Sequence, residues 1–242
     1  MSAQEESHDQ TTQGEPVGGV QRIDGREAES GQEEIRALRE GGQEEGKLSG
    51  IPPWMPQFLS DVCVMVQGGV GATARTLAAH WAAEFPGWKY LAVEPHPRAV
   101  RLAEAAWPGV VLPYAIHDRV DNVALHSCGS ESGALNRPLG VAGHKSWWVG
   151  TTTLDDVAEY ADWPEGVFLW LDVPDDPLPG LRSADRLLQR TVALAVRVPM
   201  APRYVHQARR EEVEAFLCDA GFRLLRVFAC TPRWALTFWQ PR

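Results

Sequence analysis

The sequence predicts an α/β protein with a mostly parallel sheet that is closed by an antiparallel hairpin at the C-terminal end. Short apolar runs of strand length alternate with amphipathic stretches from residue 62 onward, which indicates parallel βαβ units. The last two apolar runs, 222–229 and 233–239, are joined by only three residues. Because so short a link cannot cross over to a parallel neighbour, these two strands must form a hairpin.

The remaining elements follow from the same alternation of patterns. Further strands are expected at the apolar runs, near 62–66, 88–93, 109–114, 122–127, 147–153, 166–173 and 192–198. Helices are expected at the amphipathic stretches, at about 71–85, 97–106, 178–189 and 209–220. A further short helix is expected to start at Thr153, and Gly221 is expected to end the helix at 209–220. Residues 128–146 are rich in glycine and serine and are expected to form a long loop.

Residues 1–50 differ in composition from the rest of the chain. They hold 12 acidic and 5 basic side chains, which gives a net charge of −7 out of −9 for the whole chain, and they contain no aromatic residue. Such a segment cannot bury enough apolar surface to offset its chain entropy. We therefore expect a disordered acidic tail at 1–50 and a folded domain at 51–242.

Composition also limits the class of partner. The folded part is nearly neutral and has no basic stripe, which disfavours nucleic acid and favours a small-molecule substrate. No apolar run reaches the length of a membrane span and no signal peptide is visible, so a cytoplasmic protein without a membrane partner is expected. Four widely spaced cysteines disfavour a metal site.

A glycine-rich turn followed by an acid is the main functional signal. The turn comprises Gln67, Gly68, Gly69 and Gly71, and the next strand ends at Glu94, followed by Pro95. Ligands of open α/β sheets bind at such turns, where glycines admit a close approach and an acid accepts ribose hydroxyls. The pattern predicts a nucleoside-containing cofactor. The alternatives are a tight turn without a ligand and an ordinary surface glutamate.

Further candidate residues follow other apolar runs. His117 and Asp118 come after the third strand, where Asp118 either faces an adenine ring or only forms a turn. Asp172 ends the most hydrophobic strand and is either a general base or substrate-orienting group, or the cap of the next helix. Trp147 and Trp148 either pack within the protein or form the floor of a substrate pocket.

Four blocks between about Val62 and Cys230 resemble the FkbM family of S-adenosylmethionine-dependent methyltransferases. They are VQGGVGATA, YLAVEPHPRAV, AIHDRVDNVALHSCGSESGALNRP and TTTLDDVAEYADWPEGVFLWLDVPDDPLPGLRSADRLL. The resemblance implies a Rossmann-like class I methyltransferase fold with S-adenosyl-L-methionine as cofactor, and Asp172 as the catalytic residue. The residues it assigns to the cofactor are Gln67, Gly68, Gly69, Gly71, Glu94, Pro95, His117 and Asp118.

The chain departs from the family's pattern in two strands. Met65 stands where family members usually carry an aspartate near the cofactor's amino acid moiety, and Gln67 replaces a glycine. At the strand before Asp172, the family pattern Lys-x-Asp-Val-Glu-Gly becomes Trp-Leu-Asp-Val-Pro-Asp, so that Trp170 replaces the lysine.

Three functions are consistent with these residues. The first is methylation of a hydroxyl on a small molecule or sugar. The second is a non-catalytic binding or scaffold protein on the same fold, which Met65 and Trp170 favour. The third is an NAD-dependent oxidoreductase, which the match of residues 69–74 to the dinucleotide fingerprint favours and the closing hairpin opposes.

Overall fold

The computed structural model describes residues 51–71, 80–127, 133–140, 145–160 and 166–242. The expected acidic tail at 1–50 lies outside the described residues, as does most of the expected helix at 71–85. Of that helix, residues 80–84 are described and are helical. Among the described residues, no helix is long and apolar enough to cross a membrane.

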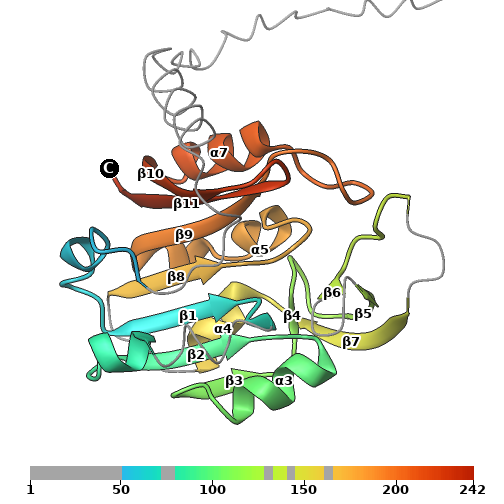
Figure 1. Cartoon of the computed structure of the whole chain (residues 1–242), viewed down its shortest axis with the longest axis horizontal. Helices are drawn as coiled ribbons and strands as arrows, with labels where there is room; N and C mark the ends of the chain where they lie inside the picture. The colour runs from blue at the N-terminus through green and yellow to red at the C-terminus, as the bar shows by residue number, and fades with distance from the viewer. Residues whose placement is uncertain (1–50, 72–79, 128–132, 141–144, 161–165) are drawn as a thin grey trace, which may run out of the picture.

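Seven strands form the central sheet in the order β10-β11-β9-β8-β1-β2-β3 (Figure 1). Five of them, β1, β2, β3, β8 and β9, run parallel, and β11 is antiparallel to both β9 and β10. The predicted fold class is therefore confirmed. The bounds are β1 Val64–Gly68, β2 Lys89–Val93, β3 Val110–Leu112, β8 Val167–Leu171, β9 Thr191–Pro199, β10 Phe222–Cys230 and β11 Trp234–Pro241.

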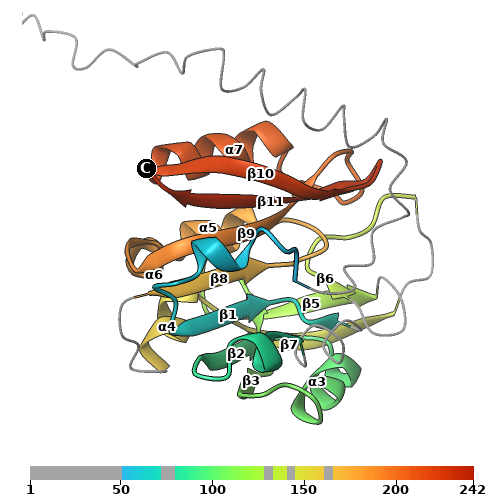
Figure 2. The same ribbon diagram turned by 60° about the vertical axis from the view of Figure 1, so that its left-hand side comes forward.

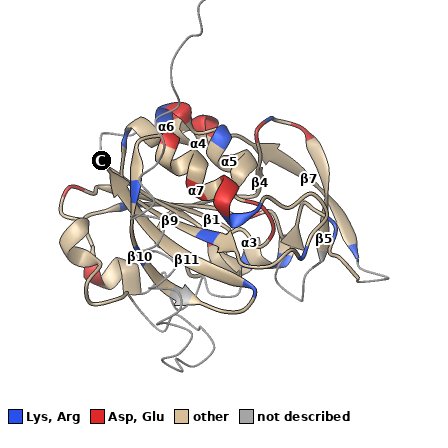
Figure 3. Cartoon of the chain, turned by 90° about the horizontal axis from the view of Figure 1, so that it is seen from above, with Lys and Arg blue, Asp and Glu red and all other residues tan. Residues whose placement is uncertain are grey.

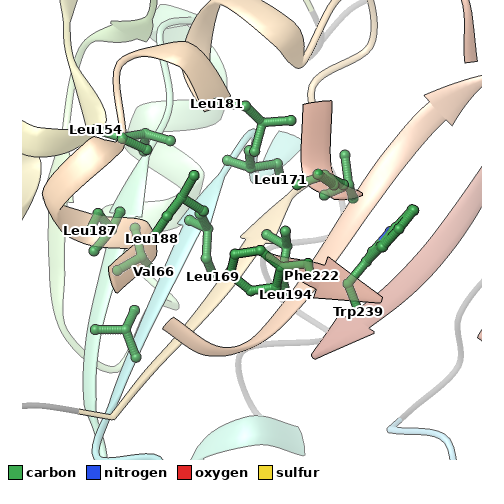
Figure 4. Close-up of a cluster of buried hydrophobic side chains, with 14 of the residues drawn as sticks. Val66, Leu154, Leu169, Leu171, Leu181, Leu187, Leu188, Leu194, Phe222 and Trp239 are labelled. Carbon is green, nitrogen blue, oxygen red and sulfur yellow. The ribbon is translucent and has the colours of Figure 1, made fainter. Parts of the chain in front are cut away.

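One face of the sheet is covered by four helices. They are α4 (Leu154–Tyr160), α5 (Leu178–Arg182), α6 (Asp185–Gln189) and α7 (Arg210–Asp219). Figure 4 shows leucines from α4, α5 and α6 gathered against Leu169 and Leu171 of β8. Burying one leucine contributes about 1.5–3 kcal/mol. Their burial therefore holds β8 against these helices.

The opposite face is covered by aromatic residues. It packs against the 3₁₀ turn Pro56–Phe58, the helical residues 80–84 and helix α3 (Pro97–Glu104). The Trp81 ring lies 5.4 Å from the ring of Phe168 and 5.7 Å from that of Trp170, measured between ring centroids. Strand β8 is thus buried on both sides, as expected for a central parallel strand.

The expected helix at 178–189 is two short helices, α5 and α6, which corrects that prediction. Ser183 ends the first: its hydroxyl donates to the Gly180 carbonyl at 2.7 Å and accepts the Leu154 N–H at 3.0 Å. Such side-chain to backbone hydrogen bonds compete with helix continuation. Figure 3 shows charged residues of both signs on α4 and α6, where Arg186 pairs with Asp155 and Glu159.

A second, four-stranded sheet is inserted between β3 and α4. It has the order β4-β7-β5-β6, with β4 Ala115–Ile116, β5 Asn122–Ser127, β6 Gly133–Ala134 and β7 Ser146–Thr152. The expected strands at 122–127 and 147–153 are confirmed. Strand β6 falls inside the expected loop at 128–146 and is too short to give a pattern. Figures 1 and 2 show this sheet beyond the carboxyl ends of β1 and β8.

Candidate functional site

A cavity of about 470 Å³ lies between the carboxyl ends of the parallel strands and the inserted sheet. Its volume falls in the usual range for small-molecule and cofactor sites. Seven of the nine residues predicted as functional from the sequence line it. They are Gly69, Gly71, Glu94, Pro95, His117, Asp118 and Asp172.

The glycine turn is held between β2 and β8 by its backbone. The Gly69 N–H donates to the Val93 carbonyl at 2.9 Å, and the Asp172 N–H donates to the Gly68 carbonyl at 2.8 Å. Gly69 has a φ of 76°, and a Cβ atom on it would lie 2.5 Å from the Asp172 carbonyl oxygen. Both the backbone conformation and the space therefore require glycine here.

The Glu94 carboxylate is tied to the glycine turn. One oxygen, Oε2, accepts the N–H groups of Val70 and Gly71 at 2.9 Å each, and Oε1 accepts the His96 N–H at 2.8 Å. The residue is only 4% exposed, and this burial raises the pKa of Glu94 although the three N–H groups oppose the shift. A carboxylate has about four acceptor positions, so one remains for a ribose hydroxyl.

Gln67 and Gly68 do not line the cavity, in contrast to their predicted contact with the cofactor. Gln67 is fully buried and lies on the same face of β1 as Met65, because side chains alternate along a strand. Gly68 lies against the cavity wall: a Cβ atom on it would come within 2.3 Å of the Ile116 side chain. Gln67 and Gly68 therefore support the glycine turn without contacting the cavity.

Asp172 forms an ion pair with Arg197 of β9. Burial raises the pKa of the Asp172 carboxyl, and the adjacent guanidinium opposes that shift. The alternative that Asp172 caps the next helix is wrong. Pro177 is the N-cap residue of α5, and the Leu178 N–H at its first turn donates to the Asp176 carboxylate at 2.9 Å, while Asp172 lines the cavity.

His117 and Asp118 lie together at another part of the cavity wall. The Nδ1 atom of His117 is 2.6 Å from Oδ1 of Asp118. Both follow β4, so the inserted sheet positions them opposite the end of β2.

Trp147 and Trp148 do not form the floor of this cavity, since neither lines it. The Trp147 ring packs edge-on against His96, with 4.9 Å between centroids. The Trp148 side chain is 79% exposed on the outer face of β7. The packing alternative therefore applies to Trp147, and Trp148 is a surface residue.

Six polar lining residues were not predicted from the sequence: Asn136, Asp175, Asp176, Arg182, Arg197 and His206. Two of them join the loops around the cavity. Asp175 accepts the Asn136 N–H of the inserted segment at 2.8 Å, and Asp176 accepts the Ala208 N–H at 3.1 Å. His206 has a φ of 60°, which is uncommon outside glycine and marks a constrained loop. Only its unusual backbone distinguishes His206, and the sequence carries no signal for it.

The departures from the family pattern in β1 and β8 lie away from the cavity. Met65 and Trp170 belong to the buried aromatic cluster on the other face of the sheet, and neither lines the cavity. The register of β1 and β8 places Met65 beside Phe168 and Gln67 beside Trp170. Met65, Gln67 and Trp170 therefore form one adjacent group inside the core, whereas Pro174 and Asp175, which stand at the family's glutamate and glycine positions, line the cavity.

Comparison with solved structures finds methyltransferases at low identity. The magnesium protoporphyrin IX methyltransferase ChlM from Synechocystis PCC 6803, with bound SAM, is 12% identical, with a TM-score of 0.41 over 94% of this chain and 87% of that chain. The METTL16 MTase domain is 14% identical, with a TM-score of 0.40 over 90% and 82%. An O-methyltransferase family 2 protein from Planctomyces limnophilus, in complex with apigenin, is 10% identical, with a TM-score of 0.42 over 82% of this chain.

This chain spans about half of the Planctomyces protein, 54% of its length. No curated protein sequence matches the chain significantly. The model of the methyltransferase FkbM domain matches residues 69–224, which is more than half of the chain and includes Gly69, Gly71, Glu94 and Asp172. The chain therefore belongs to the FkbM family of methyltransferases.

Proposed function

We propose that the chain binds S-adenosyl-L-methionine in the cavity and methylates a hydroxyl group of a small molecule or sugar. One observation carries the proposal: the glycine turn lies between two acidic residues at the cavity, held by the carboxylate of Glu94 after β2 and by the backbone N–H of Asp172 after β8. An acid at the first position suits a ribose, and an acid at the second suits the reacting groups.

Each end of the cavity has a distinct task in this proposal. Glu94 offers its remaining acceptor position to a ribose hydroxyl, and the glycine turn admits the nucleoside close to the backbone. His117 and Asp118, on the inserted sheet, are placed to contact the adenine ring. The acceptor lies toward Asp172, Arg197 and His206.

The cofactor supplies an electrophilic methyl group on a sulfonium. Asp172 would take the proton of the acceptor hydroxyl as that oxygen receives the methyl group. Burial raises the pKa of Asp172, which makes its carboxylate a stronger proton acceptor, while Arg197 opposes that shift. Holding the oxygen in line with the methyl group supplies much of the rate enhancement.

A second function, cofactor binding without catalysis, has one observation in its favour. The ion pair with Arg197 engages the carboxylate that would act as base. In that case the chain binds the cofactor and transfers no methyl group. The nicotinamide alternative has no such support, since the chain belongs to a methyltransferase family.

Parallel titrations of the full chain with S-adenosylmethionine, S-adenosylhomocysteine and NAD test the proposal by calorimetry. We expect binding of the first two ligands and none of NAD. Radiolabelled S-adenosylmethionine is then offered with a panel of sugars, phenols and aliphatic alcohols. Label transfer to a hydroxylated acceptor supports the proposal, whereas binding without any transfer supports the non-catalytic function.

A further inference from the structure

A small notch lies next to the cofactor cavity and is rich in arginine. It has a volume of about 20 Å³ and shares Val173, Pro174, Asp175 and Arg197 with the wall of the main cavity. Its other lining residues are Pro199, Arg203, Gln207, Arg233 and Trp234. Three arginine residues and one acidic residue, Asp175, thus line a space that holds about one water-sized group. The guanidinium of Arg203 lies over the Tyr204 ring, with its carbon 5.8 Å from the ring centre.

Arg197 is anchored at the base of this notch. Its Nε atom faces the Asp172 carboxylate in the ion pair, and its guanidinium carbon lies 4.5 Å from the centre of the Trp234 ring. Its side chain is 24% exposed. Among the described residues, the terminal amino groups of Arg197 form no ion pair, so the planar edge suited to a carboxylate or phosphate is available.

Arg203 and Arg233 add charge at the rim. Both are exposed, and within the described part of the chain neither forms an ion pair with an acidic side chain. The Asp175 carboxylate, in contrast, already accepts the Asn136 N–H, and burial raises the pKa of Asp175, which disfavours its charged form. The charge of Arg197 is paired with Asp172, so the uncompensated positive charge of the notch comes from Arg203 and Arg233.

We propose that Arg197, Arg203 and Arg233 form a binding site for an oxyanion, a carboxylate or a phosphate group, beside the acceptor end of the cavity. The notch itself would hold one oxygen of such a group, and the exposed side chains of Arg203 and Arg233 are long and flexible enough to adjust to the rest of it. The anionic group is either part of the methyl acceptor or a separate ion such as inorganic phosphate. Only the first of these sources rests on the proposed function.

Calorimetric titration of the full chain with inorganic phosphate, at constant ionic strength, tests the site. We expect saturable binding to the wild type and at least tenfold weaker binding to the double variant Arg203→Gln/Arg233→Gln. Arg223→Gln is the matched control, because Arg223 is an exposed arginine on β10 outside the notch. It should bind phosphate as the wild type does.

The double lysine variant, Arg203→Lys/Arg233→Lys, separates the effect of the positive charge from that of the guanidinium shape. It also keeps the proposal testable if the glutamine variant does not fold. It should bind phosphate with intermediate affinity, since lysine keeps the charge and loses the planar fork. Equal phosphate affinity in the wild type, the glutamine variant and the control would overturn the proposal. So would the absence of saturable binding to the wild type.

The source of the anion is identified with glucose and glucose 6-phosphate, each titrated in the presence of S-adenosylhomocysteine. Tighter binding of the sugar phosphate than of inorganic phosphate supports the site and assigns it to the acceptor. Equal binding supports the site and assigns it to a separate ion. Failure of S-adenosylhomocysteine to bind, with phosphate binding intact, would overturn the proposed function and leave the oxyanion site standing.

Discussion

The carboxylate of Asp172 and the guanidinium of Arg197 form an ion pair across the carboxyl ends of β8 and β9. The pairing depends on a register shift between Val167 and Phe168, after which Leu171 lies beside Val196. Continued by one position, this register places Asp172 beside Arg197. Without the shift, Asp172 would face the apolar Val196 and its buried charge would lack a partner.

Asp172→Asn should lower methyl transfer by about a hundredfold or more, the usual scale for loss of a general base. The affinity for S-adenosylhomocysteine should change little, because the amide keeps the shape of the side chain. Single-turnover rates and calorimetry measure the two effects. Asp219→Asn, an exposed position at the end of α7, is the control. Full activity of Asp172→Asn would exclude the role as base.

Gly69→Ala should weaken binding of S-adenosylhomocysteine at least tenfold, because the new methyl group would collide with the Asp172 carbonyl. Gly221→Ala is a matched control: its φ of 87° is also left-handed, and a Cβ atom there meets nothing within 4 Å. Both variants carry the conformational cost of about 1–2 kcal/mol, and only Gly69→Ala should also lose affinity. Equal affinities in a calorimetric titration would contradict this.

The site residues that directly follow a predicted strand could be predicted from the sequence. A continuous apolar run predicts a buried parallel strand, and the glycine turn and Glu94 follow such runs directly. The strand order then brings both together with Asp172, as observed. Periodicity and chain order suffice for this because each residue lies at the end of its own strand.

The rest of the site depends on contacts that no sequence pattern encodes. The Arg197 pairing requires the register shift in β8 and β9, and Asp175 meets Asn136 across 39 positions of the chain. Gln67 belongs to the apparent glycine motif, yet alternation along β1 turns its side chain into the core. The direction of its side chain depends on which residues of β1 face the core, and the glycine motif alone does not predict this.

Asp175→Asn should flatten the dependence of the free energy of unfolding on pH. Burial raises the pKa of Asp175, so the folded chain holds the proton more tightly than the unfolded chain. The stabilising contribution is present below the ordinary aspartate pKa of about 3.9 and is lost as the pH rises through the raised value. The amide oxygen of the variant can still accept the Asn136 N–H.

Urea unfolding between pH 4.5 and 8 measures this effect. The stability of Asp175→Asn relative to the wild type should increase toward the upper end of this range. The flattening is partial, since burial also raises the pKa values of Glu94 and Asp172. Parallel curves for the variant and the wild type would show that the Asp175 carboxyl does not contribute.

Glu94→Gln should loosen the glycine turn and weaken cofactor binding together. The carboxylate accepts three backbone N–H groups through two oxygens, and an amide replaces one oxygen with a donor. In either amide orientation at least one N–H loses its acceptor inside the protein, at a cost of about 1–3 kcal/mol. In a chain of this size, each kcal/mol lowers the Tm by about 2–4 °C.

Thermal unfolding and titration with S-adenosylhomocysteine measure the two consequences of Glu94→Gln. Glu104→Gln, at an exposed position on α3, should change neither. The opposite result is also informative, because burial raises the pKa of Glu94 and a neutral amide removes the cost of burying a charge. A higher Tm with unchanged affinity would therefore show that Glu94 neither holds the turn nor contacts the ribose as a carboxylate.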